Sequence, residues 1–282
     1  MAPKPSFPPG ALAVVALPLG NPADITLRAL QVLAEADLVA AEDTRTAGRL
    51  LARHGVRAPL LSYHDWNEDQ RAPALIGRLE QGQRIALVSE AGTPGISDPG
   101  YDVVRLARQR GIPVFPVPGP CAVTAFLSVS GLPTDAFSFF GFPPSRPPRR
   151  RELFHSLSDR RETLVFYESP RRVLAALAAA EESFGDREAA LGRELTKPHE
   201  EVLFGTLSSL QEALAPRARV LGEVCWGVRG AQAVPPRPDE PSAAALQEAA
   251  GSGLPPREAA RVLAKRSGLS VKEAYTLLLR RR

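Results

Sequence analysis

The chain has 282 residues, more than one compact core usually takes, so we expect two domains. A hydrophobic fraction of 44% and a charged fraction of 23% are ordinary for globular proteins and exclude a wholly disordered chain. The formal net charge is +4, but residues 255–282 hold eight basic side chains against two acidic ones, a net +6. Subtracting this +6 from the total leaves −2 for the rest of the chain. The basic C-terminal segment therefore predicts a polyanionic partner.

Cysteine use and hydropathy indicate the compartment. Cys121 and Cys225 lie far apart and neither belongs to a CxxC pair, which argues against a disulfide framework or a cysteine-based metal site. The apolar run 11–19 is interrupted by Pro18, so we interpret it as a first strand rather than a signal peptide. No apolar stretch approaches membrane-spanning length. We predict a soluble, cytoplasmic protein with no membrane partner and no metal.

The first half alternates short apolar runs with longer amphipathic ones. Strands are predicted at 12–17, 38–41, 85–89 and 114–116, and helices at 25–34, 46–54, 70–80 and 101–110. Asp24 is placed to cap the first of these helices. Strand–helix alternation with fully apolar strands predicts a parallel sheet covered by helices on both faces.

A second α/β unit is predicted after the Pro- and Arg-rich stretch 143–151, which we interpret as a loop between the domains. Its predicted strands are 163–167, 189–193, 203–204 and 220–228, with helices at 172–184 and 208–214. Residues 231–253 are rich in Pro, Ala, Gly and Ser and read as a linker. Two helices, 256–266 and 271–279, follow it, and Ser270 with Glu273 forms a capping box for the second. The predicted domains are 1–118 (N-terminal α/β), 119–231 (C-terminal α/β), 232–254 (linker) and 255–282 (basic helical module).

Four loops follow predicted strands, at the sheet edge where open α/β sheets bind ligands, and three of them are rich in Gly and Pro. They are 18–22, 41–45, 89–100 and 116–122. Any one of them alone is most simply a tight turn, but four on one edge predict a ligand site. There is no GxGxxG and no GxxxxGK[ST], so dinucleotide and triphosphate sites are not supported. A ligand held by backbone groups and apolar walls, without a phosphate anchor, is expected, and S-adenosylmethionine fits because its sulfonium cation prefers carbonyl oxygens to a basic loop.

The motifs together resemble the tetrapyrrole methylase superfamily of S-adenosylmethionine-dependent methyltransferases. Within it they are most similar to the bacterial 16S rRNA (cytidine 2′-O)-methyltransferases. The segments that carry the resemblance are Pro18–Asn21, Asp24–Leu30, Ala41–Arg45, Leu61–His64, Val88–Tyr101, Pro118–Pro120, Ser130–Asp135, Phe166–Pro170, Arg193–Lys197, His199–Glu201 and Gly205–Leu207. The resemblance runs in order from the first strand to Thr206, and the basic tail resembles the family's C-terminal appendage. Two positions depart from the pattern: Glu90 stands where the family usually has Asp, and Arg229 where it usually has Glu.

The resemblance implies two α/β domains with the cofactor in the cleft between them, a homodimer, and 2′-O-methylation of a cytidine ribose in the 16S rRNA of the small ribosomal subunit. The cofactor-binding residues that it implies are Pro18, Gly92, Thr93, Pro94, Ile96, Cys121, Ala122, Tyr167 and Val228. The residues that we select for proton transfer or substrate alignment are Asp43, Arg45, His64 and Glu168, with Glu90, His199 and Glu200 as further candidates. For binding of the RNA we expect Arg146, Arg149, Arg150, Arg151 and the basic tail to supply phosphate contacts.

Each catalytic candidate also has a purely structural interpretation. Asp43 is placed to cap a helix or pair with Arg45, His64 to satisfy a loop, and Glu168 to order a helix start. His199 and Glu200 also fit a structural turn or a dimer contact. Two other functions stay open: a methylase of the same superfamily acting on a corrin or porphyrin precursor, and a non-catalytic RNA-binding assembly factor. The basic segments argue against the first, and the intact Gly- and Pro-rich loops against the second.

Overall fold

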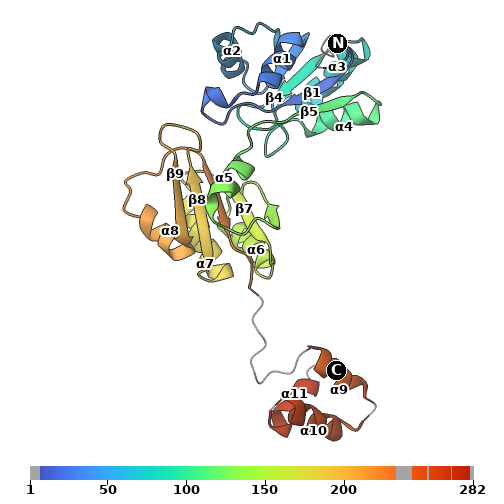
Figure 1. Cartoon of the computed structure of the whole chain (residues 1–282), viewed down its shortest axis with the longest axis vertical. Coiled ribbons are helices and arrows are strands. Elements are labelled where there is room, and N and C mark those ends of the chain that lie inside the picture. Colours follow the sequence, from blue (N-terminus) through green and yellow to red (C-terminus); the bar gives the residue numbers. More distant parts are fainter. Residues whose placement is uncertain (1–6, 233–242, 253, 268, 280–282) are drawn as a thin grey trace. The chain divides into compact units, whose positions relative to one another are not determined.

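A computed structural model describes residues 7–232, 243–252, 254–267 and 269–279 of the chain. It divides into two compact units, Met1–Ala231 and Gln232–Arg282, and each is described here by itself. Figure 1 shows that the first unit contains two sheets with their covering helices, whereas the second is helical.

The first sheet is parallel throughout, as predicted. Its strands are β1 (Leu12–Val15), β2 (Leu38–Ala41), β3 (Leu60–Ser62), β4 (Ile85–Val88) and β5 (Val114–Val117). They lie in the order β3-β2-β4-β1-β5. The connecting helices are η1 (Pro22–Asp24), α1 (Leu27–Glu35), α2 (Thr44–Arg53), α3 (Glu68–Glu80) and α4 (Tyr101–Gln109). Strand β3, which we did not predict, is an edge strand whose residues are only half-buried, so it lacks the fully apolar signal of its neighbours.

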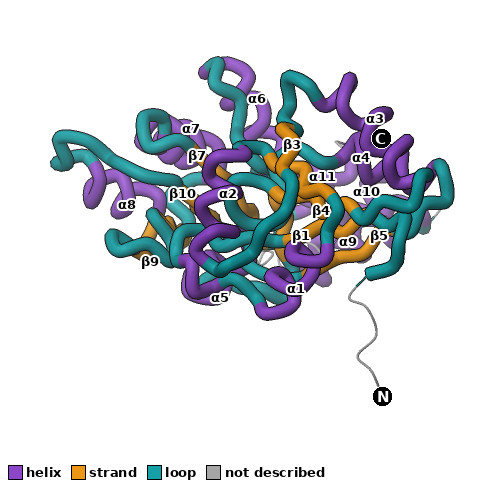
Figure 2. Tube along the Cα trace, turned by 90° about the horizontal axis from the view of Figure 1, so that it is seen from above, coloured by secondary structure: helices purple, strands orange, loops and turns teal. Residues whose placement is uncertain are grey.

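Alternate side chains of the strands enter two separate cores. On β1, Ala13 and Val15 pack with α1 and α2, whereas Leu12 packs with α3 and α4 on the other face. Figure 2 shows these two helix pairs on opposite sides of β1 and β4. Both faces of the sheet are therefore covered, and the carboxyl ends of its strands are the part left open to a ligand.

Three helices begin two residues from their predicted starts, α1 at Leu27, α2 at Thr44 and α3 at Glu68, and the first two starts are set by their caps. Asp24 lies in η1, and the cap of α1 is Thr26, whose Oγ1 accepts a hydrogen bond from the Ala29 amide at 3.0 Å. Helix α2 begins at Thr44 because Asp43 caps it.

The second sheet of the same unit is mixed. Its strands are β6 (Phe137–Phe139), β7 (Thr163–Glu168), β8 (Glu188–Arg193), β9 (Glu201–Thr206) and β10 (Val224–Val228), in the order β6-β7-β10-β8-β9. Helices α6 (Pro147–Leu157), α7 (Val173–Phe184) and α8 (Leu207–Leu214) pack on one face around Trp226, and α5 (Ala122–Ser130) packs on the other. Only α5 covers that second face in the described residues, which leaves room beside it.

The expectation of a loop at 143–151 is wrong in its second half. Pro147 and Pro148 begin helix α6, because proline is tolerated in the first turn of a helix. Within this helix Arg149 and Arg151 are exposed, but Arg150 is buried at 6% exposure. Arg150 therefore faces the protein interior and is not available to a phosphate.

The second unit holds three helices, α9 (Ala243–Gly251), α10 (Pro256–Ser267) and α11 (Val271–Leu279). Helix α9 lies inside the stretch that we expected to be a linker, and its Ala249 packs against Ala260 and Leu263 of α10. The alanine-rich composition that suggested a linker is equally a strong helix-forming composition. Residues 233–242 of the expected linker lie outside the described residues. In the part of the chain that the structure describes, no helix is long and apolar enough to span a membrane.

Candidate active site

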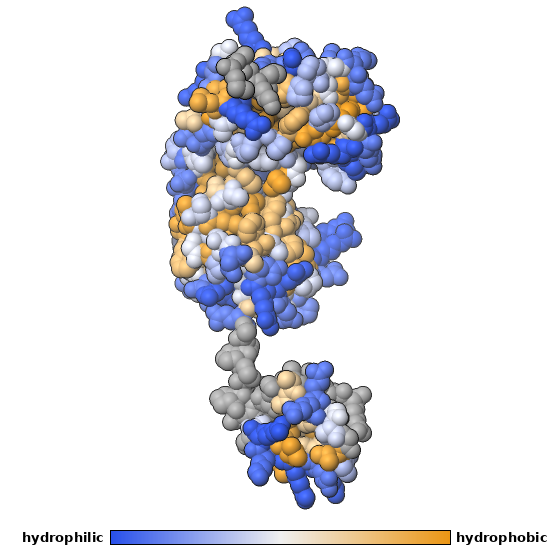
Figure 3. All heavy atoms as spheres, turned by 45° about the vertical axis from the view of Figure 1, so that its right-hand side comes forward, coloured by the Kyte–Doolittle hydropathy of each residue, from blue (hydrophilic) through white to orange (hydrophobic). Residues whose placement is uncertain are grey.

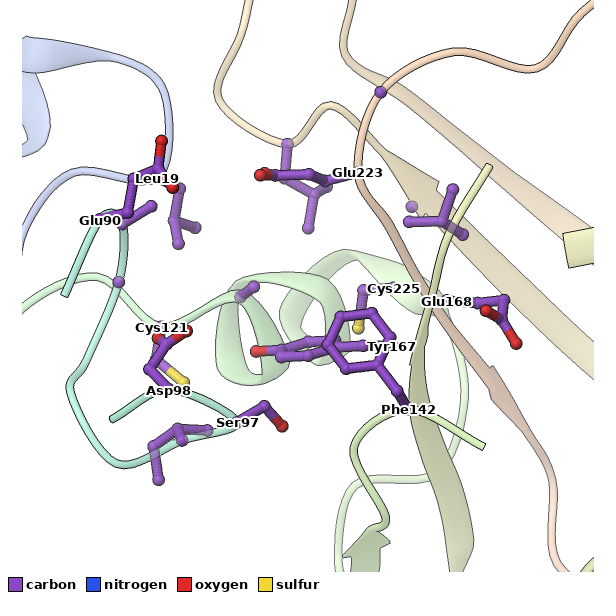
Figure 4. Close-up of a pocket in the computed structure, with 18 of the residues that line it drawn as sticks. Leu19, Glu90, Ser97, Asp98, Cys121, Phe142, Tyr167, Glu168, Glu223 and Cys225 are labelled. Atoms are coloured by element: carbon purple, nitrogen blue, oxygen red, sulfur yellow. The ribbon is translucent and has the colours of Figure 1, made fainter. Parts of the chain in front are cut away.

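A pocket of about 350 Å³ opens between the two sheets of the first unit. It lies beyond the carboxyl ends of β2 and β4 and meets β7, β8 and β10 of the second sheet (Figure 4). Its lining residues are Leu19, Glu42, Glu90, Ala91, Gly92, Thr93, Ile96, Ser97, Asp98, Cys121, Ala122, Phe142, Tyr167, Glu168, Ser169, Pro170, Gly192, Leu195, Gly222, Glu223, Val224 and Cys225. The volume is in the range of pockets that hold small-molecule ligands.

Three of the predicted loops are joined to one another at the pocket. Leu17 and Gly92 exchange backbone hydrogen bonds of 2.8 and 3.0 Å, which ties the loop after β1 to the loop after β4. Gly92 has a φ of +73°, and a Cβ there would lie 3.2 Å from Leu19. The hydroxyl of Thr93 donates to the carbonyl of Pro120 at 3.0 Å, which adds the loop after β5. These loops form one rigid wall with backbone groups close to the pocket.

The opposite wall is a row of residues in register across the second sheet. Cys225 of β10 pairs with Tyr167 of β7 on one side and Gly192 of β8 on the other. The ring of Tyr167 packs edge-on against Phe142, with centroids 5.6 Å apart. In Figure 4 the Tyr167 hydroxyl points toward Cys121 and Asp98 across the pocket. This wall is apolar and aromatic, which suits the flat ring of a bound molecule.

The charge of the pocket has one sign. Among its described lining residues there is no Lys, Arg or His, but there are five carboxylates: Glu42, Glu90, Asp98, Glu168 and Glu223. A site of this composition favours a cation and disfavours phosphate.

Two of these carboxyls hold protons more tightly than usual. Burial raises the pKa of Asp98 to about 7, and the charges of Glu42, Asp65 and Glu223 add to this rise against the hydrogen bond from Ser89. Burial also raises the pKa of Glu42, whose Oε2 accepts from the amide of Glu90 at 3.2 Å. Carboxyls with raised pKa values in a pocket are characteristic of functional sites.

A cluster of charged residues supports the edge of the pocket at Gly222 and Glu223. The ammonium of Lys197 lies 2.9 Å from Glu194 Oε1 and 3.2 Å from Glu223 Oε2. The same loop contacts the loop after β1, because the hydroxyl of Thr196 accepts a hydrogen bond from the amide of Asn21 at 3.1 Å. Glu194 and Thr196 both have positive φ angles, 50° and 67°. Such strain persists only where the surroundings impose it, so this loop is held in a defined shape.

Most residues predicted to bind the cofactor line this one pocket. They are Gly92, Thr93, Ile96, Cys121, Ala122 and Tyr167. Pro18 and Pro94 belong to the same loops but are not among the lining residues. Val228 lies at the far end of β10, paired with Leu164 and Ala189 and buried in the core beneath helices α6 to α8. The structure thus brings six of the nine together and separates Val228 from them.

Asp43 and Arg45 lie outside the lining residues and have the structural roles considered for them. Asp43 Oδ1 accepts from the amides of Arg45 at 2.7 Å and Thr46 at 3.3 Å, and its other oxygen pairs with Arg45 at 3.4 Å. The Arg45 amide, together with that of Thr46, holds the pKa of Asp43 below its usual range. Asp43 is therefore a poor proton acceptor, although its neighbour Glu42 lines the pocket.

His64 and Glu168 are also bound by their own surroundings. The backbone of His64 donates to Asn67 at 2.9 Å, and the Asn67 amide lies 3.1 Å from His64 Nε2. Glu168 lines the pocket but is almost fully buried, with Oε1 at 2.8 Å from the Ser169 amide and 2.6 Å from the Arg172 guanidinium. In Figure 4 its carboxylate points away from Tyr167. Of the further candidates, Glu90 lines the pocket, Glu200 accepts from the Thr196 amide, and His199 is exposed.

The lining residues that we did not select include Glu42, Asp98, Gly192, Glu223 and Cys225. Glu42 and Asp98 lie in loops that the sequence pattern predicts to form the site. Their position could therefore be predicted from the sequence, but the burial of their side chains could not. Cys225 and Gly192 enter the site through strand register, which has no local sequence signal. Arg229, which stands where the family usually has Glu, is not among the residues that line the pocket, and its guanidinium pairs with Glu188.

Comparison with known proteins places this fold and pocket in a family. The family model for tetrapyrrole (corrin/porphyrin) methylases matches residues 11–211. The chain therefore belongs to the tetrapyrrole methylase family. Both sheets of the first unit, and the loops that form the pocket, lie within or next to the matched range.

Two curated relatives and one solved structure show what the chain is similar to. It is 45% identical to the ribosomal RNA small subunit methyltransferase I of Mesorhizobium japonicum, over 95% of this chain and 91% of that one. It is 49% identical to the protein of the same name from Escherichia coli O157:H7, over 68% of each. A crystal structure of uroporphyrin-III C-methyltransferase from Thermus thermophilus, complexed with S-adenyl homocysteine, has a TM-score of 0.54 and 20% identity, and covers 77% of this chain and 97% of that one. That last likeness is one of fold.

Proposed function

We propose that this protein transfers the methyl group of S-adenosylmethionine to the ribosomal RNA of the small subunit. The observation that carries the proposal is the pocket, which has five carboxylates and, among its described lining residues, no cation. A sulfonium ligand is a cation, so this charge favours its binding. The RNA substrate is supported by relatives named for small-subunit rRNA methylation that match nearly the whole chain.

The residues present fit S-adenosylmethionine. Gly92 and Thr93 offer backbone groups on one wall, while Tyr167 and Phe142 offer aromatic faces on the other. Cys121 and Ala122, at the start of α5, lie between the two walls. When bound, the cofactor supplies an electrophilic methyl group on a positively charged sulfur. The part of the protein is to hold the acceptor in line with that group and to exclude water.

We infer that the acceptor is the 2′-hydroxyl of a cytidine ribose in 16S rRNA, as the sequence motifs imply. The surface that would hold the RNA includes Arg146, Arg149 and Arg151 around the start of α6, all of them exposed. This helix follows the loop of Phe142, which lines the pocket. Phosphate contacts from these arginines would orient the RNA with respect to the reacting atoms. The substrate also implies a cytoplasmic location.

The proposed assembly is a homodimer. Two large apolar side chains are exposed on this part of the unit: Val129 of α5, at 54%, and Phe204 of β9, at 58%. The Phe204 ring lies 3.3 Å from the position that a Cβ on Gly131 would take, so it lies against the C-terminal end of α5, two residues beyond Val129. Figure 3 shows a broad apolar area on the part of the molecule that carries the second sheet. A second copy of the chain would cover such a surface.

The dimer is tested by light scattering coupled to gel filtration. We expect Phe204→Glu to turn a dimer into a monomer, because the interface would then bury an unpaired charge. Leu27→Glu is the matched control, since Leu27 is also an exposed apolar residue but lies on α1, which packs on the first sheet rather than the second. A monomeric wild type, or a dimer that survives Phe204→Glu, would contradict the proposed interface.

The function is tested with labelled S-adenosylmethionine and small ribosomal subunits that lack the modification, beside naked rRNA and a mixture of corrin precursors. We expect label in the subunit rRNA, at a nucleotide whose 3′ linkage resists alkali because its 2′-oxygen is methylated. Label in a corrin precursor would assign a small-molecule substrate instead. Failure of the cofactor to bind in calorimetry would return the protein to the non-catalytic class.

A further inference from the structure

A ribose hydroxyl is a poor nucleophile at neutral pH, so the reaction proposed above needs a positioned proton acceptor. Carboxylates and histidines are the usual acceptors, and a candidate must lie in the pocket with an oxygen or nitrogen free to take a proton. The inference below rests on the proposed function and asks which side chain has this role.

Most candidates are already committed to other partners. Glu168 Oε1 is ion-paired with Arg172, and although its Oε2 has no hydrogen-bond partner in the described residues, the carboxylate is turned away from Tyr167 in Figure 4. Glu223 is paired with Lys197. Glu90 lines the pocket but is exposed, so it lacks the burial that would make its carboxylate more basic. Glu42 accepts a hydrogen bond from the Glu90 amide. Asp43 and His64 lie outside the lining residues.

Asp98 differs from these groups. It lines the pocket, is partly buried, and forms no ion pair with any Lys, Arg or His of the described residues. In Figure 4 it lies beside Cys121, on the side of the pocket toward which the Tyr167 hydroxyl points. Its carboxylate therefore faces the space that a substrate would enter.

The loop that carries Asp98 is held at both ends. At one end is the backbone pairing of Gly92 with Leu17. At the other, Glu68 Oε1 accepts hydrogen bonds from the amides of Gly100 at 3.3 Å and Asp102 at 3.1 Å. Between them Ser97 has a φ of 64°. A backbone held in this way fixes the direction of Asp98 and lowers the cost of aligning it during the reaction.

The surroundings of Asp98 also suit a base that works near neutral pH. Groups from four separate segments face it: Glu42 after β2, Asp65 after β3, Ser89 after β4 and Glu223 before β10. Burial and the three acidic side chains raise its pKa to about 7, while the Ser89 hydroxyl opposes that rise. A base whose pKa lies near the working pH is deprotonated often enough to act and basic enough to take a proton.

We propose that Asp98 is the general base of the methyl transfer. As the ribose 2′-oxygen bonds to the methyl carbon, the carboxylate of Asp98 takes the hydroxyl proton. The electron pair of the breaking sulfur–carbon bond stays on sulfur, which becomes a neutral thioether. Asp98 then returns its proton to water, and the charges balance.

The test compares Asp98→Asn with the wild type and with Asp69→Asn, a matched change at an exposed position of α3 outside the pocket. We expect Asp98→Asn to lower kcat roughly 10²–10⁴-fold. The kcat of the wild type should rise with pH through a single ionisation, and that step should be missing in Asp98→Asn. Calorimetry should give the same cofactor Kd for Asp69→Asn as for the wild type, and a rise of no more than about tenfold for Asp98→Asn, which removes one of the five carboxylates of the pocket.

A second readout does not depend on turnover. Carbon NMR of protein labelled at the aspartate carboxyl should show one resonance that titrates near pH 7 and is absent from Asp98→Asn. Asp98→Asn with unchanged kcat and pH profile would overturn the proposal. A large loss of cofactor affinity with little loss of kcat would also overturn it, because Asp98 would then be a cofactor ligand. A wild type that binds cofactor but methylates no rRNA would instead count against the proposed function.

Discussion

The side chain of Lys197 occupies the space that a side chain at position 20 would need. A Cβ placed on Gly20 would overlap Cγ of Lys197, so only glycine lets the lysine pass. Gly20 belongs to the loop after β1 on the first sheet, and Lys197 to the loop after β8 on the second. The lysine then reaches Glu223, which lines the pocket. This one close approach thus couples the two walls of the site.

Replacing Gly20 by alanine should therefore weaken cofactor binding. The new methyl group displaces Lys197 and, with it, the pairing that holds Glu223 in place. We expect the Kd for S-adenosylmethionine to rise roughly tenfold, a change of about 1.4 kcal/mol. Gly77→Ala is the control, because Gly77 lies in α3 with no atom within 4 Å of an added Cβ. Equal affinities for Gly20→Ala and the wild type in calorimetry would show that Lys197 can move without cost.

Lys197→Met tests the charge separately from the shape. Methionine keeps most of the aliphatic chain over Gly20 but removes the ammonium that Glu194 and Glu223 share. The Lys197 ammonium holds the pKa of Glu194 below its usual range, so the pKa of Glu194 should rise in this variant. We expect KM for the cofactor to rise several-fold with kcat changed by less than about twofold, which marks loss of ground-state binding. A fall in kcat alone would place Lys197 in the chemical step instead.

The sequence predicted four of the five strands of the first sheet, and the loops that line the pocket, because both depend on local patterns. Apolar runs such as 85–88 define buried parallel strands, and the Gly- and Pro-rich loop 89–100 marks the sheet edge where ligands bind. Local patterns do not predict that Cys225 lines the pocket, because Cys225 and Val228 both lie on β10 and only strand register decides which of them pairs with Tyr167.

The choice among acidic residues needed burial and hydrogen bonds, which a sequence does not contain. Asp43 and Asp98 are both aspartates in loops after strands, yet one caps a helix and the other faces a pocket. The environment lowers the pKa of the first and raises that of the second. Likewise Arg149 and Arg150 are adjacent in the sequence, but the turn of α6 exposes one and buries the other.

Substitutions of Asp43 should affect helix α2 rather than catalysis. Asparagine is also a good N-cap, so Asp43→Asn should keep the cap and retain kcat within about twofold. Asp43→Ala removes the acceptor for the amides of Arg45 and Thr46 and should lower the free energy of unfolding. Denaturant unfolding and single-turnover methylation of the two variants check this. A large loss of kcat in a folded Asp43→Asn would restore Asp43 as a catalytic residue.

The Glu201 carboxylate should make the stability depend on acid. Arg217 binds it through two hydrogen bonds of 2.7 and 2.8 Å, and Arg193 adds a third at 3.1 Å. The Arg217 contacts, with those of Arg193, lower the pKa of Glu201 from 4.5 to about 2. Because the folded value lies below the unfolded one, this stabilisation is complete above pH 4.5 and is lost as the pH falls toward 2.

Glu201→Gln should therefore lower the free energy of unfolding at pH 7 by on the order of 2 kcal/mol, with the difference from wild type shrinking as the pH falls below 4.5. Denaturant unfolding at pH 7 and pH 3 measures both values. Glu212→Gln, at an exposed position of α8, is the control. A difference that stays constant with pH would mean that the ionised form of Glu201 contributes nothing.

Helix α10 of the C-terminal unit should provide a stripe of phosphate contacts. Arg257, Arg261 and Lys265 are exposed and four residues apart, so they lie along one face of the helix. Replacing all three by glutamine should weaken rRNA binding and reduce the slope of log K against log salt by about 2 to 3, since each phosphate contact contributes about 0.7 to 0.9. Cofactor affinity should not change, because the pocket lies in the other unit.

Arg53, Arg57 and Arg78, all exposed on the first unit, give a control triple with the same loss of charge. Filter binding to rRNA over a range of salt concentrations measures both triples. If the two triples reduce affinity and salt slope equally, the basic charge acts through the overall field of the protein. If only the α10 triple does so, the helix itself contacts the RNA. The three exposed cations along one face of α10, rather than the net charge of the chain, then account for the binding.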